Sequence, residues 1–136
     1  MKDFRSLIPA GVFLLLLSPW PAAAETVQGK TYLCAVTEVI ECSPLGDCVR
    51  VSPEDARLQD FIRLDLENGL LRAAGQEDKR QTRIRATEVM DGKTILTGME
   101  NGRGWNAVLS EDKRDLTGTI SDTKAGFVVF GACREE

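Results

Sequence analysis

The chain has 136 residues, of which 17 are basic and 21 acidic, so its formal net charge is −4. This acidic balance argues against nucleic-acid binding, which needs a concentrated positive surface. The sequence contains no histidine, and this excludes sites in which a histidine activates a serine or cysteine nucleophile.

The first 24 residues have the pattern of a secretory signal peptide. Lys2 and Arg5 give a basic start, Leu7–Leu17 is an apolar run, and Ala22–Ala24 supplies small residues for cleavage. The apolar run is shorter than the roughly 20 residues that a membrane span needs. We therefore expect export to a periplasm, or secretion, and one domain over residues 25–136 that has a net charge of −5 and no membrane span.

The predicted mature part contains four cysteines: Cys34, Cys42, Cys48 and Cys133. An even number of cysteines in a small exported domain predicts two disulfides. Three pairings are possible. We favour Cys42–Cys48, which closes a short loop of turn-forming residues, and Cys34–Cys133, which ties the first predicted strand to the last. A redox pair or metal site is the alternative. The chain has no C-x-x-C motif and no histidine, so we predict no metal and no cofactor.

Alternation of apolar and polar residues predicts about eight short strands after the leader. The predicted strands are Lys30–Ile40, Asp60–Leu66, Leu70–Ala74, Gln81–Val89, the two arms of Lys93–Ser110, Asp115–Ser121 and Gly126–Cys133. Residues Val49–Val51 are at most one further short strand. In the strand at Gln81–Val89 we expect Ile84 and Ala86 to face inward. The segment Ser52-Pro53-Glu54-Asp55 has the composition of a helix start, and it predicts one short helical turn near residues 53–58.

The hairpin at Lys93–Ser110 is the centre of the predicted fold. Asn101-Gly102 separates its two alternating arms, and both central residues of the favoured two-residue turn need a positive φ. Asp91-Gly92 gives the same signal one strand earlier. Trp105 is the largest side chain on the inward face of this hairpin, so we expect it in the core.

Together these patterns predict an all-β fold, a single small antiparallel meander that forms a barrel or a sandwich. An eight-stranded barrel has an interior that side chains fill or that holds one small ligand.

No catalytic residue is predicted. The segment Gly102–Ala107 matches G-x-G-x-x-A, but a dinucleotide-binding fingerprint must follow a strand and open a helix. Here the segment follows a turn and enters a strand. We expect Gly104 to let backbone pack near the Trp105 ring, or to relieve a bulge.

Two groups of residues are candidates for ligand or partner contacts. Arg83 and Arg85 belong to the basic cluster of the chain and should share an outer strand face, where they form either a mixed charged surface or an anion-recognising patch. Trp105 is the second candidate: if it is not core, it lines the mouth of the barrel together with Arg103 and Asn106.

The spacing Cys-x7-Cys-x5-Cys and the segments VSPEDARLQDFIRLDLENG, ENGRGWNAVLS and FVVFGAC resemble a group of uncharacterised exported proteins of proteobacteria. That group has no activity to transfer. In architecture the chain is also similar to small-barrel periplasmic lysozyme inhibitors. Those proteins insert a loop of Ser-Gly-x-x-Tyr character into the lysozyme cleft. This sequence has no such segment, and its one tyrosine, Tyr32, lies in the first predicted strand.

Our leading hypothesis is an exported, non-enzymatic β-barrel that acts as a binding or envelope-interaction module for an unidentified protein or small molecule. One alternative is a small-ligand carrier, which predicts a cavity lined by Trp105, Leu96, Leu116 and Phe127. The other is a protein inhibitor of a cell-wall hydrolase.

Overall fold

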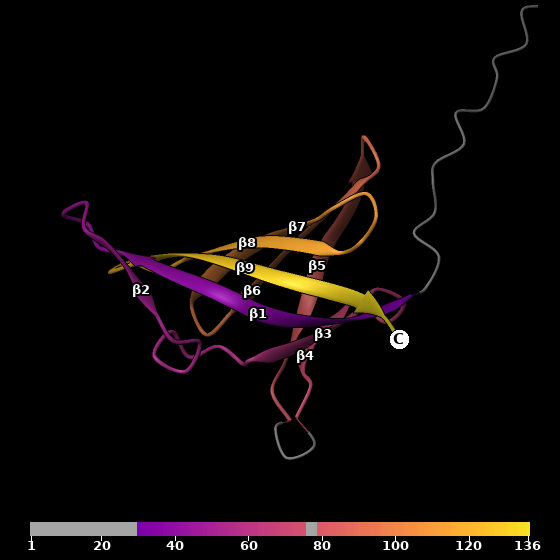
Figure 1. Ribbon diagram of the computed structural model, residues 1–136, viewed down its shortest axis with the longest axis horizontal. Helices are drawn as coiled ribbons and strands as arrows, with labels where there is room; N and C mark the ends of the chain where they lie inside the picture. Colours follow the sequence, from indigo (N-terminus) through magenta and orange to yellow (C-terminus); the bar gives the residue numbers. More distant parts are fainter. Residues whose placement is uncertain (1–29, 76–78) are drawn as a thin grey trace, which may run out of the picture.

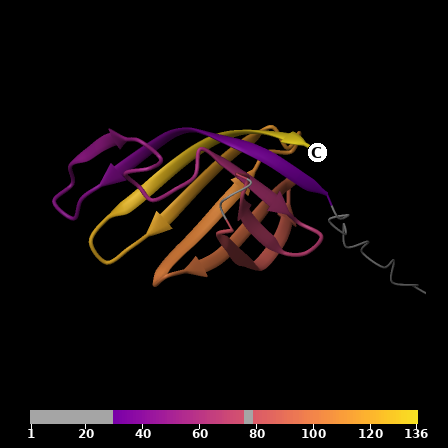
Figure 2. The same cartoon turned by 90° about the horizontal axis from the view of Figure 1, so that it is seen from below.

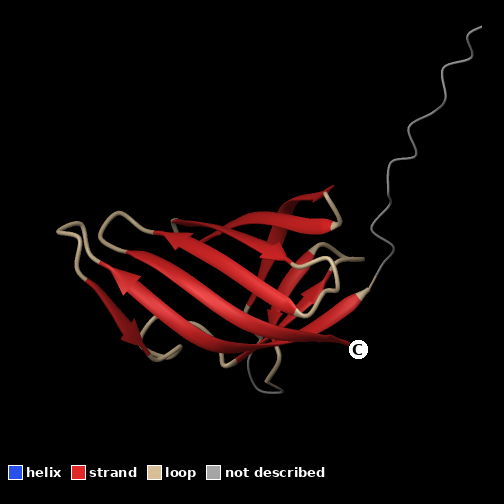
Figure 3. Ribbon diagram, turned by 45° about the horizontal axis from the view of Figure 1, so that its top comes forward, coloured by secondary structure: helices blue, strands red, loops and turns tan. Residues whose placement is uncertain are grey.

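The computed structural model describes residues 30–75 and 79–136, and within these ranges the regular structure consists of strands without any helix (Figure 3). The strands are β1 (Thr31–Cys42), β2 (Cys48–Val51), β3 (Phe61–Asp65), β4 (Leu70–Ala73), β5 (Gln81–Met90), β6 (Lys93–Glu100), β7 (Arg103–Leu109), β8 (Asp115–Ser121) and β9 (Gly126–Glu135). The all-β prediction is confirmed. The predicted signal peptide, residues 1–24, lies outside the described residues.

Eight of the strands close into an antiparallel barrel, so the predicted meander is a barrel and not a sandwich. From β3 to β9 each strand pairs with the next one in the chain, and β1 pairs with both β3 and β9 (Figures 1 and 2). The β1–β9 pairing runs from Tyr32 opposite Glu135 to Cys42 opposite Gly126. The short strand β2 lies outside this ring and pairs with β1.

Both predicted disulfides are present. Cys34 and Cys133 lie opposite one another on β1 and β9, and their Cα atoms are 4.0 Å apart. Cys42 and Cys48 lie opposite one another on β1 and β2, with Cα atoms 4.1 Å apart. The Cys34–Cys133 bridge therefore joins the two strands that close the barrel, β1 and β9. The Cys42–Cys48 bridge joins β1 to β2, the strand that lies outside the ring.

The tight turns form where the sequence predicted them. Asp91 and Gly92 have φ values of 50° and 75°, and Asn101 and Gly102 have φ values of 50° and 78°. Each pair joins directly hydrogen-bonded strands, β5 to β6 and β6 to β7. A positive φ at both central residues is the conformation that matches the right-handed twist of the flanking strands.

The barrel interior is packed. Its main core has eight buried residues, Tyr32, Cys34, Leu64, Ile84, Leu96, Ala107, Leu109 and Leu116. A second, smaller core lies where β1 and β9 run on beyond the β1–β3 pairing, and it consists of Val39, Ala56, Phe127 and Val129. Of the four residues that the carrier hypothesis places around one cavity, Trp105 lines the pocket at the barrel mouth, whereas Leu96, Leu116 and Phe127 do not line that pocket and are each less than 10 % exposed.

A β-bulge changes the inward face of β5. Ile84 is buried as predicted, but Ala86 is exposed, so that part of the prediction is wrong. The register shifts between Ile84 and Ala86, which leaves Arg85 as the extra residue. One inserted residue reverses the alternation of every side chain that follows it.

The segment after β2 forms one hydrogen-bonded turn and not a helix. The Ser52 hydroxyl accepts a hydrogen bond from the Asp55 backbone N–H at 3.1 Å, in the manner of a helix N-cap. The Leu58 N–H donates to the Pro53 carbonyl at 2.8 Å, and Arg57 has a φ of 59°. This is the arrangement that ends helices, so here the start and stop signals leave room for one turn only.

Candidate functional site

The candidate site is a pocket of about 290 Å³ at one mouth of the barrel. Its lining comes from β4, the starts of β3, β5 and β7, the ends of β6 and β8, the β6–β7 turn and the segment before β3. In an antiparallel meander the ends of even-numbered strands and the starts of odd-numbered ones meet at the same rim. The topology therefore gathers residues that are far apart in the sequence.

The wall of the pocket is apolar. Five apolar side chains line it, Leu58, Ile62, Leu71, Trp105 and Ile120. Four of them, Ile62, Leu71, Trp105 and Ile120, stand on strands and pack against the two cores. A binding surface of this kind favours a ligand with an apolar part, because burial of apolar area is worth roughly 25 cal/mol per Å².

Trp105 is held in place by a glycine. Gly98 on β6 lies opposite Trp105 on β7, and a Cβ atom added at Gly98 would lie 2.2 Å from the Trp105 ring. The indole ring thus covers the glycine backbone. At Gly104 a Cβ atom would meet no atom within 4 Å outside the two chain neighbours, and the pairings of β7 show no register shift there, so neither a cross-strand contact nor a bulge requires this glycine.

Arg103 connects the pocket rim to the segment that covers it. Its Nε atom donates to Asp122 Oδ2 at 2.9 Å and its Nη1 atom donates to the Ala56 carbonyl at 3.3 Å. The guanidinium also lies over the Phe127 ring, 5.2 Å from its centroid. The hydrogen bond from Arg103 holds the pKa of Asp122 below its ordinary value. Arg103 therefore fixes the turn at residues 53–57 against the barrel.

The rim of the pocket has charged groups of both signs. Three arginines and two carboxylates line the pocket, Arg57, Arg80, Arg103, Glu100 and Asp122. Arg103 and Asp122 form an ion pair, and Arg57 is an exposed residue of the segment before β3. A guanidinium group at the rim favours an anionic group on a ligand, because it donates charge-assisted hydrogen bonds.

The structure brings together only some of the predicted contact residues. Trp105 and Arg103 line the pocket as the mouth hypothesis expected. Asn106 is exposed and is not among the lining residues. Arg83 and Arg85 are exposed on β5, again outside the lining. The basic patch predicted at Arg83 and Arg85 and the pocket at the barrel mouth are therefore separate parts of the surface.

Sequence reasoning missed the other half of the pocket. Ile62, Leu71 and Ile120 were expected only as core or strand residues, yet they also form the pocket wall. Each belongs to an inward-facing set near a strand end. That position indicates a pocket residue only when it is known that the barrel closes and that these strand ends meet at one rim.

The described parts of the chain contain no group of three or more cysteine, aspartate or glutamate side chains placed to hold a metal ion. No helix long and apolar enough to cross a bilayer occurs in residues 30–75 and 79–136. The two disulfides are consistent with an oxidising compartment outside the cytosol.

No protein-family model, no curated protein and no solved structure matches this chain.

Proposed function

We propose that the protein is an exported, non-enzymatic binding module and that the barrel mouth is its binding site. The observation that carries this proposal is the pocket in which the Trp105 ring and apolar strand residues form the wall and Arg57 lies at the rim. Because this pocket lies at the barrel mouth, we place the ligand there.

The proposed ligand has an apolar part of a few carbon atoms and one anionic group. The apolar part meets Ile62, Leu71 and Trp105, and the anionic group lies near Arg57 at the rim. At about 290 Å³ the pocket is at the lower end of the range for small-molecule sites. It fits a small amphiphile, or one end of a larger envelope molecule.

Export is part of the same proposal. The predicted signal peptide and the two disulfides support a periplasmic or secreted location. The test is to recover the chain from the exported fraction of the cells that make it. The amino terminus should be at Glu25 and the four cysteines should resist alkylation. A full-length, alkylatable chain in the cytosol would contradict this part.

Trp105 gives a direct test of ligand binding. Residues 25–136 contain a single tryptophan, because Trp20 belongs to the predicted leader. We expect octanoate to change the Trp105 fluorescence saturably, and octylamine to bind at least about tenfold more weakly, a difference of about 1.4 kcal/mol. The measurement is a fluorescence titration of the oxidised domain with each compound.

A matched pair of substitutions locates the site. Ala73→Leu places a larger side chain in the pocket lining and should weaken octanoate binding at least about tenfold. Ala86→Leu makes the same change at an exposed position on β5 and should leave binding unchanged. Equal binding of octanoate and octylamine, or an effect of Ala86→Leu as large as that of Ala73→Leu, would contradict the proposal.

A further inference from the structure

The tip of the β1–β2 hairpin is a second exposed feature, separate from the barrel mouth. The loop Ser43-Pro44-Leu45-Gly46-Asp47 joins the strands, and the Leu45 side chain at its apex is 92 % exposed. The hairpin lies at one end of the molecule, away from the carboxyl terminus (Figures 1 and 3). A single exposed leucine is common on protein surfaces. What distinguishes Leu45 is the way in which its backbone is held.

The loop is held by one disulfide and three hydrogen bonds. The Cys42–Cys48 disulfide closes it, the Ser43 N–H donates to the Asp47 carbonyl at 2.8 Å, and the Gly46 N–H donates to the Ser43 carbonyl at 3.1 Å. The Leu45 N–H also donates to the Ser43 hydroxyl at 3.3 Å. Pro44 has a fixed φ. The apex therefore holds the Leu45 backbone in one conformation.

The barrel does not need these restraints. β1 is held along its length by β9, from Tyr32 to Cys42, and the barrel closes through β3 without β2. The Cys42–Cys48 bridge spans six residues and restrains only the hairpin. What it provides is a rigid apex, and rigidity before binding lowers the entropy that a protein contact loses.

We propose that this stapled apex is a preformed docking element for a partner protein and that Leu45 is its anchor. The partner presents an apolar socket that takes one leucine side chain, since buried apolar anchors dominate binding at protein interfaces. The charged side chains of the β1–β2 hairpin are Glu38, Glu41, Asp47 and Arg50, and Arg50 is paired with Glu38. Glu41 and Asp47 leave the hairpin with a net negative charge, so the rim of the partner's socket is basic and complementary to it.

The test begins with a cross-linker beside the anchor. Val49 is 58 % exposed on β2 and Met99 is 64 % exposed on β6. The oxidised domain carrying p-benzoylphenylalanine in place of Val49 is irradiated in an envelope extract of the producing cells. The same domain with the cross-linker in place of Met99 is the control. We expect one protein to be captured from position 49 only, and to be lost when Leu45→Ala is added.

The captured protein is then identified, purified and titrated against the oxidised domain. Leu45→Ala should weaken its binding at least about tenfold, whereas Leu45→Met should stay within about threefold and Met99→Ala should have no effect. Asp47→Lys should slow association. Circular dichroism in the far and near ultraviolet verifies that each variant is folded.

Three outcomes overturn the proposal. They are the absence of a product specific to position 49, a partner that binds Leu45→Ala as tightly as the unchanged domain, and capture of a second copy of this chain alone. A circular dichroism spectrum of Leu45→Ala that differs from that of the unchanged domain would mean a damaged fold, and binding by the Leu45→Met variant then decides whether the leucine is the anchor. Because the mouth and the apex do not share residues, failure of one proposal leaves the other standing.

Discussion

At the scale of single residues, the contact between Gly98 and Trp105 decides the shape of the pocket. Both residues lie on inward faces of neighbouring strands, opposite one another. The ring occupies the volume that a side chain at position 98 would fill. Glycine is normally unfavourable in a strand because it loses backbone freedom and offers no packing. Here the indole ring supplies the missing packing.

Gly98→Ala should destabilise the domain by about 1–3 kcal/mol, because the new methyl group forces the ring or the strand to move. Urea unfolding measures the loss, and near-ultraviolet circular dichroism reports the displaced ring. Gly104→Ala is the control on β7. Its new methyl group would meet no atom within 4 Å outside the two chain neighbours. The substitution should therefore leave the free energy of unfolding unchanged, or raise it by up to about 1 kcal/mol. Equal effects of the two substitutions would show that strand propensity, and not the ring, decides.

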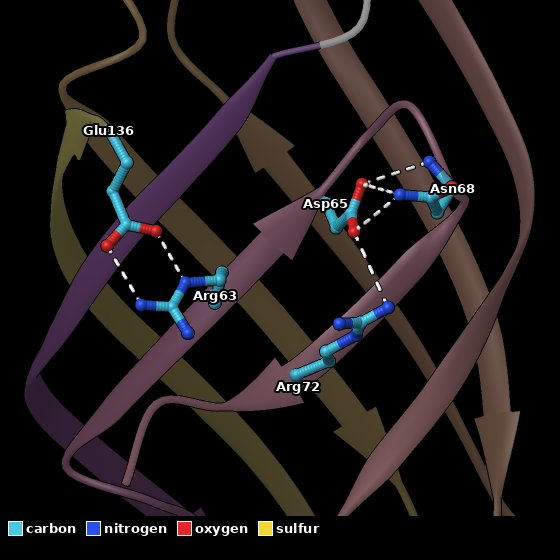
Figure 4. Close-up of polar contacts among 5 residues, drawn as sticks. All are labelled: Arg63, Asp65, Asn68, Arg72 and Glu136. Atoms are coloured by element: carbon cyan, nitrogen blue, oxygen red, sulfur yellow. Dashed lines mark hydrogen bonds and ion pairs between the residues drawn. The ribbon is translucent and has the colours of Figure 1, made fainter. Parts of the chain in front are cut away.

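At the scale of elements, the β3–β4 hairpin depends on the carboxylate of Asp65. Figure 4 shows its oxygens facing Asn68 and Arg72, while Arg63 on the same strand faces Glu136. Asp65 Oδ1 accepts hydrogen bonds from the Asn68 backbone N–H at 2.9 Å and from Asn68 Nδ2 at 3.0 Å. Arg72 Nη2 lies 3.5 Å from Asp65 Oδ2. The hydrogen bonds from Asn68, and secondarily the charge of Arg72, hold the pKa of Asp65 below its ordinary value of 3.8.

This depressed pKa predicts an acid-sensitive hairpin. A carboxyl group with a lowered pKa in the folded state contributes stability above its unfolded pKa, and the contribution disappears as the pH falls through the folded value. Asp65→Asn should therefore cost about 1–2 kcal/mol at pH 7. The difference from the unchanged domain should vanish as the pH falls below 3.8.

Urea unfolding of both proteins between pH 7 and pH 2 measures this effect. Asp60→Asn, at an exposed aspartate just before the same strand, is the control. If the stability difference between Asp65→Asn and the unchanged domain is constant over that range, the Asp65 carboxylate is not the group responsible.

At the scale of the whole molecule, one disulfide closes the barrel and the other does not. Cys34–Cys133 has a sequence separation of 99 and joins the two strands that seal the ring, whereas Cys42–Cys48 has a separation of 6. In the chain-entropy model a loop of about 100 residues is worth about 4.7 kcal/mol, and the short loop about 2 kcal/mol.

Replacing Cys34 and Cys133 by alanine should therefore lower the free energy of unfolding by at least about 4 kcal/mol. Replacing Cys42 and Cys48 by alanine should lower it by about 2 kcal/mol or less. Urea unfolding of the two double variants and of the unchanged domain gives the comparison. A larger loss from the short loop would mean that the hairpin, and not the β1–β9 closure, limits the stability of the barrel.

The elements could be predicted because their causes are local. Asn101-Gly102 and Asp91-Gly92 form turns because only a few residue types adopt two successive positive φ values without strain. The alternation of Leu116, Gly118 and Ile120 sets the inward face of β8 because strand side chains alternate. The disulfide pairing followed from the short loop at Cys42–Cys48 and from the need to join the first strand to the last.

The remaining features could not be predicted because their causes are contacts across the fold. The bulge at Arg85 reverses the face of Ala86 although the local alternation continues. The turn at residues 53–57 covers the second core, where Ala56 is buried and Arg103, 47 residues along the chain, donates to the Ala56 carbonyl. Likewise, Ile62 on β3 shares a rim with Trp105 on β7 only when the barrel closes.

The sequence by itself determined the strands, the tight turns, the two disulfides and the inward faces of most strands, since each depends on backbone preferences or on a period of two. The tertiary structure alone decided that the sheet closes into a packed barrel and that a pocket remains at its mouth. It also decided that Gly98, and not Gly104, accommodates the tryptophan. These are properties of which strands become neighbours and in what register, and no single strand carries that information.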